Sequence, residues 1–131
     1  MIKFAYTILY VSDVKRSVDF YSKIFDLEVR FVTPEADYAE LNAGTTTLSF
    51  ASLDFANSNL KSGFRENSLQ EKPFAMEIGF TTDNVKELVD KAVAAGATLL
   101  LEPQSKPWGQ VVAYIRDFDG FLVEICTPMA G

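Results

Sequence analysis

The pattern of apolar and polar positions changes its period several times along the chain. Residues 4–11 alternate between the two kinds, which predicts a β-strand. Apolar residues then recur at spacings of four, three and four, which predicts an amphipathic helix that begins after Asp13. The apolar stripe of this helix consists of Val14, Val18, Tyr21 and Phe25. The first structural unit is therefore a strand followed directly by a helix.

The same pattern returns seventy-one residues later. Residues 76–81 alternate, Asp83 is a candidate helix cap, and residues 14–19 and 85–90 share the pattern V-K-x-x-V-D. The second apolar stripe consists of Val85, Leu88, Val89, Ala92 and Val93. The chain therefore contains an internal repeat, whose second helix is followed by Gly96, a residue suited to a left-handed helix end.

Three short strands are predicted after each helix. They span 27–32, 38–41 and 46–52 in the first half and 98–102, 110–116 and 121–126 in the second. Each half is then a βαβββ module, with module one at 1–53, a polar linker at 54–74 and module two at 75–131 of a single domain. The expected class is α+β: two tandem modules forming a curved mixed sheet around a cavity, with the helices on its outer face.

Composition excludes several kinds of chemistry. The 131 residues include no histidine and one cysteine, so Ser–His–Asp catalysis, His-bearing metal sites and an internal disulfide are impossible within one chain. The net charge of −6 and the scattered cations argue against a nucleic-acid partner. No apolar run approaches the length of a membrane span, and no signal-peptide pattern is present. We therefore expect a cytoplasmic protein without membrane or nucleic-acid partners.

Strand alternation predicts which side chains face the cavity. Met76, Ile78 and Phe80 should face the helix, which leaves Glu77 on the other side of the strand. The same reasoning places Glu124 on the cavity side of the last strand. The face of module one should carry Tyr6, Ile8, Tyr10, Thr47, Ser49 and Ala51.

Glutamate is depleted from strand interiors, so the two mid-strand glutamates have two interpretations. They line either a solvated outer face or one concave site. If they converge, one should hold a proton unless a cation or a donor lies between them, and the Tyr6 hydroxyl is a candidate donor.

Four further side chains are candidates for a role. Trp108 is expected either to stack on a ligand or to cover an edge of the core. Tyr114 should share the cavity face, Glu40 should form a salt bridge at the rim, and Cys126 should be a buried, inert thiol.

Three segments resemble the vicinal oxygen chelate superfamily of glyoxalases, extradiol dioxygenases and bleomycin-resistance proteins. They are TILYVSDVKRSVDFY at 7–21, KPWGQ at 106–110 and DFDGFLVEI at 117–125. In metal-dependent members, the ligand positions correspond to Tyr6, Ser49, Glu77 and Glu124 of this chain. The family typically has His at the first and third of these positions and Glu at the fourth, so only Glu124 matches. The resemblance thus implies the paired-module fold and no resident metal, with Glu77 and Glu124 as weak candidates for a hard cation such as Mg²⁺ or Mn²⁺.

Metal-free relatives of the bleomycin-resistance kind are acidic homodimers that sequester a drug. The resemblance therefore implies a homodimer that binds a cationic or aromatic small molecule, with antibiotic resistance as one setting. The expected ligand-binding residues are Tyr6, Ser49, Glu77, Trp108, Tyr114 and Glu124. The alternatives are a glyoxalase-like lyase or isomerase, or a dioxygenase-type enzyme, in which Glu77 or Glu124 acts as base with or without a divalent metal, and a module that acts through protein contacts. Whether the cavity lies within one chain or across a dimer stays open.

Overall fold

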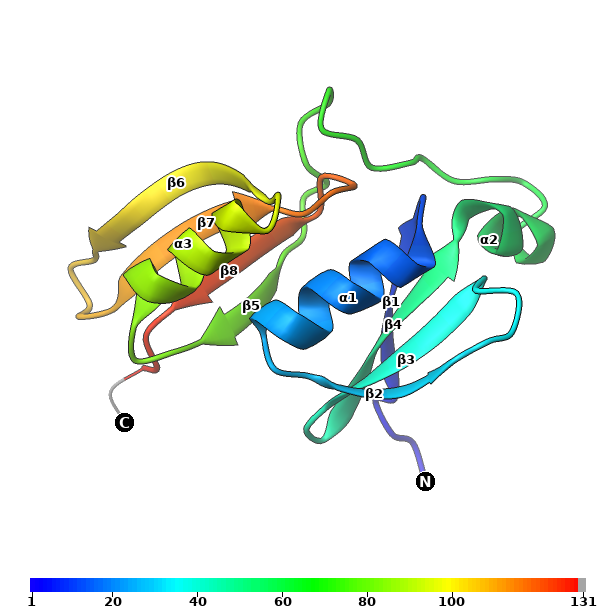
Figure 1. Ribbon diagram of the computed structural model, residues 1–131, viewed down its shortest axis with the longest axis horizontal. Helices are drawn as coiled ribbons and strands as arrows, with labels where there is room; N and C mark the ends of the chain where they lie inside the picture. Colours follow the sequence, from blue (N-terminus) through cyan, green and yellow to red (C-terminus); the bar gives the residue numbers. More distant parts are fainter. Residues whose placement is uncertain (130–131) are drawn as a thin grey trace. The chain divides into compact units, whose positions relative to one another are not determined.

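The computed structural model describes residues 1–129, and these divide into two compact units. Unit 1 is Met1–Glu66, and unit 2 begins at Asn67. Each unit consists of a four-stranded mixed sheet with a helix packed against one face (Figure 1). The expected α+β class with two βαβββ repeats is confirmed. None of the helices in residues 1–129 is long and apolar enough to cross a membrane.

Unit 1 has the sheet order β1-β4-β3-β2, in which β1 is parallel to β4 and the other neighbours are antiparallel. Its elements are β1 (Tyr6–Val11), α1 (Val14–Ile24), β2 (Glu28–Val32), β3 (Tyr38–Ala43), β4 (Thr46–Ser52) and α2 (Leu53–Asn59).

Unit 2 repeats this arrangement with the order β5-β8-β7-β6 and one parallel pair, β5 and β8. Its elements are β5 (Ile78–Thr81), α3 (Val85–Ala94), β6 (Thr98–Ser105), β7 (Val111–Arg116) and β8 (Leu122–Cys126).

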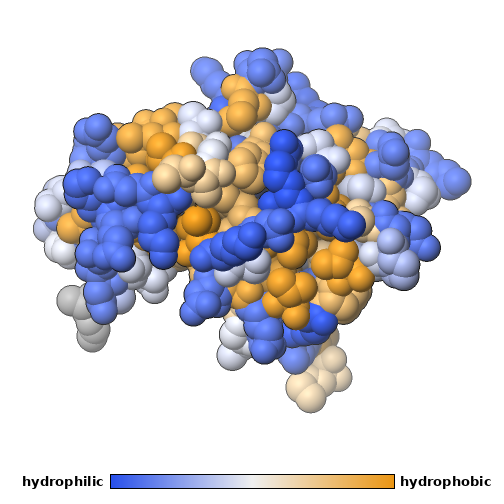
Figure 2. All heavy atoms as spheres, viewed as in Figure 1, coloured by the Kyte–Doolittle hydropathy of each residue, from blue (hydrophilic) through white to orange (hydrophobic). Residues whose placement is uncertain are grey.

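The two cores differ in composition. In unit 1, α1 brings aromatic rings onto the sheet: Tyr21 and Phe50 are both fully buried, with ring centroids 5.2 Å apart. In unit 2 the residues beneath α3 are aliphatic, and Ile115, Val123 and Ile125 are fully buried. Polar side chains cover the outward faces of α1 and α3 (Figure 2), as the two apolar stripes predict.

The helix starts follow from capping residues. Asp13 caps α1 as predicted, because its carboxylate accepts a hydrogen bond of 3.1 Å from the backbone N–H of Arg16. The prediction of Asp83 as the cap of α3 is wrong by one residue. Asn84 accepts from the N–H of Glu87 at 3.2 Å, and its own amide donates to the Glu87 carboxylate at 3.0 Å. These two hydrogen bonds between Asn84 and Glu87 satisfy one backbone N–H of the first turn and fix both side chains. An aspartate at the cap could not donate the second bond, so Asn84 is the better cap.

Three local predictions fail for identifiable reasons. Met76 is 53% exposed instead of facing the helix, because a turn from Phe74 to Met76 (N···O 2.7 Å) delays the start of β5 to Ile78. Val93, expected in the helix stripe, is 40% exposed in the last turn of α3. The predicted linker begins with a short helix, α2, whose cap is the Ser52 hydroxyl, which accepts from Phe55 N–H at 3.1 Å.

A buried arginine ties the start of unit 2 to its last hairpin. Arg116 is 7% exposed, and its guanidinium donates to the carbonyl oxygens of Gly120 and Ser68, both at 2.9 Å. Gly120 has φ +88°, and a Cβ there would lie 2.8 Å from the carbonyl carbon of Ser68. The hairpin therefore requires glycine both for its left-handed backbone and for the close approach of this segment.

Candidate functional site

The helix-free face of unit 2 brings two glutamates to one phenol. Register places Gly79, Glu124 and Tyr114 side by side across β5, β8 and β7. The Tyr114 hydroxyl lies 3.2 Å from Glu124 Oε2 and 3.3 Å from Glu77 Oε1, as a donor to both. Glu77 precedes the first residue of β5, so its side chain reaches Tyr114 from the strand entrance. We call these three residues the carboxylate pair and its phenol.

This arrangement leaves negative charge without a matching cation. Tyr114 has one hydroxyl proton for two carboxylates. Within residues 1–129, neither Glu77 nor Glu124 takes part in an ion pair. Burial, together with the charges of Glu124 and Glu77, raises the pKa of Tyr114 from 10.0 to about 12. The phenol therefore stays protonated as a donor across the physiological range.

A polar path continues from the pair toward the β6–β7 loop. Cys126 is buried, as predicted, and its Sγ lies 3.7 Å from Glu124 Oε1. Burial and then the charge of Glu124 raise the pKa of this thiol, while the Gln110 side chain acts in the opposite direction. Gln110 in turn accepts from the Trp108 indole N–H at 2.7 Å. Trp108 itself is 60% exposed, so it does not cover a core edge.

Unit 1 carries a different group at the equivalent place on its sheet. Glu40 lies opposite Ser49 in the β3–β4 register, and its carboxylate accepts from the Tyr38 hydroxyl at 2.8 Å and from Arg30 Nη1 at 3.3 Å. A hydrogen bond of 3.1 Å joins the hydroxyls of Tyr38 and Ser49. Burial raises the pKa of Tyr38; its bond to Ser49 opposes the rise, and Glu40 adds to it. The carboxylate is thus neutralised within the unit.

The salt bridge expected of Glu40 exists, but it does not lie at a rim. The Glu40 side chain is 13% exposed, whereas that of Arg30 is 45% exposed. Val29 pairs with Leu41, so strand alternation places Arg30 on the face of Glu40, and the register shift between Val29 and Phe31 sets Phe31 opposite Glu40 as well. Such a bulge re-aims one side chain of a strand.

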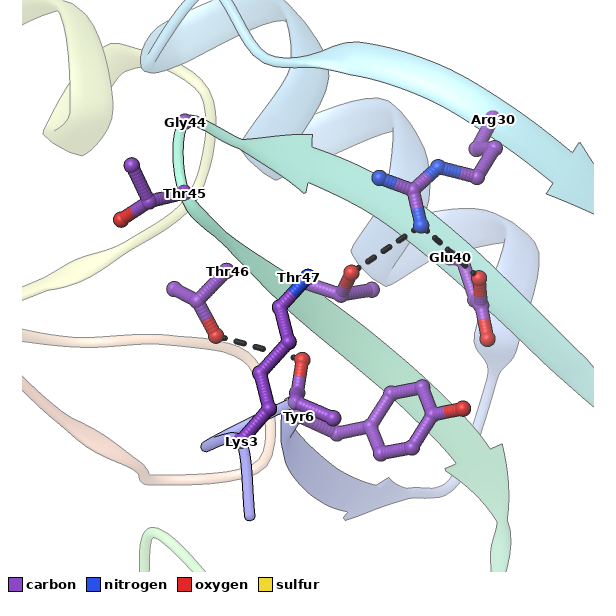
Figure 3. Close-up of a pocket in the computed structure, with 9 residues that line it drawn as sticks. Lys3, Tyr6, Arg30, Glu40, Gly44, Thr45, Thr46 and Thr47 are labelled. Carbon is purple, nitrogen blue, oxygen red and sulfur yellow. Dashed lines mark hydrogen bonds and ion pairs between the residues drawn. The ribbon is translucent and has the colours of Figure 1, made fainter. Parts of the chain in front are cut away.

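Tyr6 lines a pocket of about 540 Å³ that belongs entirely to unit 1. Figure 3 shows Tyr6 with Lys3, Arg30, Glu40 and the turn between β3 and β4 around this space. Arg30 Nη1 also donates to Thr47 Oγ1 at 3.0 Å, and the Thr46 hydroxyl donates to the Ala5 carbonyl at 3.3 Å.

The structure therefore groups the predicted residues by unit. Glu77 and Glu124 each contact Tyr114. Trp108 is hydrogen-bonded to Gln110, whose side chain acts on Cys126 next to Glu124. Within unit 2 the donor at the two glutamates is Tyr114, whereas Tyr6, the candidate donor from the sequence, belongs to unit 1. In β7, Tyr114 lies directly opposite Glu124, a pairing that follows from register and not from composition. The sequence pattern did not identify Arg30, Lys3 or Gln110 as site residues.

The four positions at which the resemblance places metal ligands hold a poor donor set. Ser49 is fully buried and already bonded to Tyr38, and a phenol such as Tyr6 is a weak ligand. Within residues 1–129, no three His, Cys, Asp or Glu side chains gather in a way that could hold a metal ion. Of the four, only Glu77 and Glu124 supply carboxylates. The set does not fit a metal that is bound mainly by imidazole.

Comparison with known proteins agrees with this architecture. The family model described as "Glyoxalase/Bleomycin resistance protein/Dioxygenase superfamily" matches residues 3–125. The chain is 26% identical over 133 residues to "Lactoylglutathione lyase GLX1" of Arabidopsis thaliana, a match that covers 94% of this chain and 43% of that protein. The chain thus spans less than half the length of this curated relative.

Solved structures share the fold at low identity. A glyoxalase-related enzyme from Fulvimarina pelagi superposes with a TM-score of 0.83 at 21% identity, over 98% of this chain and 89% of that one. A glyoxalase/bleomycin resistance protein/dioxygenase family enzyme from Burkholderia phytofirmans PsJN superposes with a TM-score of 0.78 at 23% identity, over 94% of this chain and 96% of that one. At these identities the likeness concerns the fold.

Proposed function

Because this chain belongs to the glyoxalase/bleomycin resistance protein/dioxygenase superfamily, we propose that it uses the family scaffold to capture a small molecule that carries a positive charge. The observation that supports this is the carboxylate pair with its phenol: Glu77 and Glu124 lie within hydrogen-bonding distance of one Tyr114 hydroxyl. Neither has an ion-pair partner in residues 1–129.

The physical argument concerns charge balance. A single O–H donor satisfies one carboxylate at a time, and no cation of residues 1–129 pairs with the half-buried Glu124 or the exposed Glu77. A ligand ammonium or guanidinium would supply the missing charge and hydrogen-bond donors. Trp108, 60% exposed and bonded to Gln110, which acts on Cys126 beside Glu124, offers a ring face for a cationic or aromatic part of the same ligand.

Calorimetric titration against a panel of cationic glycopeptide drugs tests this proposal. We expect binding by at least one member, and Glu124→Gln should weaken it by about tenfold or more through the loss of a charge-assisted contact. Glu102→Gln is the matched control, because Glu102 is an exposed glutamate of β6 in the same unit and its charge acts on Lys86 of α3. Failure of every compound to bind, or equal binding by both variants, would overturn the proposal.

A second candidate function follows from the match to a lactoylglutathione lyase. Here Glu124 would act as a general base, with Tyr114 as the neighbouring proton carrier. Turnover of lactoylglutathione by the purified protein, lost in Glu124→Gln and kept in Glu102→Gln, would support the lyase. No turnover, together with no stoichiometric metal and no thermal shift with Mn²⁺, Ni²⁺ or Zn²⁺, would remove it.

A further inference from the structure

We propose that unit 1 carries a separate binding site for a small oxyanion, a carboxylate or a phosphate group. The site is the pocket of about 540 Å³ between the segment that enters β1 and the turn that joins β3 to β4. All of its lining residues belong to unit 1. It shares no residue with the carboxylate pair of unit 2 and does not depend on the function proposed above.

The charges around this pocket favour an anion. Lys3 and Arg30 are its two cations, and Glu40 is its one carboxylate. The local balance is therefore positive in a chain whose net charge is −6. The pocket can therefore attract an anion even though the protein as a whole is negatively charged.

Unused hydrogen-bond donors point in the same direction. Arg30 Nη1 is bonded to Glu40 Oε1 and Thr47 Oγ1, whereas the N–H groups on Nε and Nη2 have no acceptor among residues 1–129. Figure 3 shows the second terminal nitrogen directed away from both partners. The Lys3 ammonium also lacks a partner in the described chain, and the Thr47 hydroxyl, which accepts from Arg30, keeps its own proton to donate.

The guanidinium is held in place before any ligand arrives. Thr47 is 6% exposed and the Glu40 side chain 13% exposed, so both of its anchors are largely buried. Tyr38 fixes Glu40 in turn through a hydrogen bond of 2.8 Å. A planar guanidinium with one edge anchored and another edge available is suited to pair with an oxyanion. The pocket also has room beside Gly44, where a Cβ would meet no atom within 4 Å.

The test is an NMR titration of the intact protein with inorganic phosphate and, separately, with acetate. We expect saturable shifts of the amides of 44–47 and of the Arg30 Nε–H signal. Arg30→Gln should weaken binding by about tenfold or more, and Lys3→Gln should weaken it less. Lys3 precedes β1 and is exposed, so its substitution keeps the proposal testable even if Arg30→Gln fails to fold. Lys61→Gln, which removes an exposed cation elsewhere in unit 1, is the matched control.

The two probes separate the sources of the oxyanion. Saturation by phosphate alone indicates a phosphate ester, and saturation by acetate alone indicates a carboxylate; either supports the site. The proposal is overturned if neither probe shifts 44–47, or if Lys3→Gln and Lys61→Gln weaken binding equally. It is also overturned if the shifts grow linearly without saturation.

Discussion

Units 1 and 2 place the same strands in the same register and yet treat negative charge in opposite ways. Glu124 in β8 occupies the position of Ser49 in β4, and Tyr114 in β7 that of Glu40 in β3. In unit 1 the carboxylate has a phenol and an arginine, whereas in unit 2 two carboxylates share one phenol. The difference teaches that the scaffold fixes where polar groups meet, while one edge-strand residue, Arg30, decides whether their charge is balanced internally.

The largest change in stability should follow from removing the neutralised carboxylate of unit 1, Glu40. Glu40→Gln removes the partner of Arg30 and the acceptor of Tyr38, so we expect a loss of about 1–2 kcal/mol of unfolding free energy. Urea denaturation measures it. Asp19→Asn makes the same charge change on the exposed side of α1 and should alter stability by less than about 0.5 kcal/mol. Equal effects of the two substitutions would mean that Glu40 is not balanced in the way described.

The same chemical change in unit 2 should have the opposite sign. Glu77→Gln and Glu124→Gln each remove one of two like charges near one hydroxyl, so each should stabilise the ligand-free protein by about 0.5–1 kcal/mol. The same denaturation experiment reads this out. If both variants unfold at lower urea, a fixed partner already neutralises the pair and the contrast between the units does not hold.

Unit 2 can be given the cation that unit 1 possesses. A Cβ at Gly79 would meet Glu124 Oε1 at 3.5 Å, an ordinary contact, and this glycine is not in a left-handed conformation. Gly79→Lys should therefore fold, and its free energy of unfolding should rise by roughly 0.5 kcal/mol. Its affinity for cationic ligands should fall, because the new ammonium competes with them for the carboxylate pair. Gly79→Ser adds a side chain without charge and is the control. Unchanged ligand affinity in Gly79→Lys would contradict the proposed site.

The last effect appears only at high pH. The folded protein holds the Tyr114 proton up to about pH 12, against 10.0 for an unperturbed tyrosine, so the folded state binds this proton more tightly than the unfolded state. Its contribution to stability is complete below pH 10 and is lost as the pH rises toward 12. Stability measured across this range should fall less steeply in Tyr114→Phe than in the wild type. Parallel profiles would show that Tyr114 titrates normally.

The fold could be predicted from the sequence because two of its patterns are strong: the internal repeat and the apolar stripes of the helices. The repeat offset and the two helix stripes identify the modules, and Asp13 and Gly96 mark a helix start and a helix end that the structure shows. What escaped prediction depends on single hydrogen bonds. Examples are the choice of Asn84 over Asp83 as cap and the turn that keeps Met76 out of β5.

Strand alternation was sufficient for half of the candidate site. It placed Glu124 and Tyr114 on one face, and register made them neighbours. It was not applied to β2, where alternation from Val29, opposite Leu41, places Arg30 on the face of Glu40. Alternation also ranks residues by face alone and ignores segments outside strands, so it gave no weight to Lys3.

The bond from Arg116 to the Ser68 carbonyl has a consequence for dissecting the gene. A fragment that starts at residue 74 would encode every strand of unit 2 together with α3, yet would remove one of the two acceptors of a buried guanidinium. The shortest piece expected to fold alone therefore starts at Asn67, ahead of any regular secondary structure.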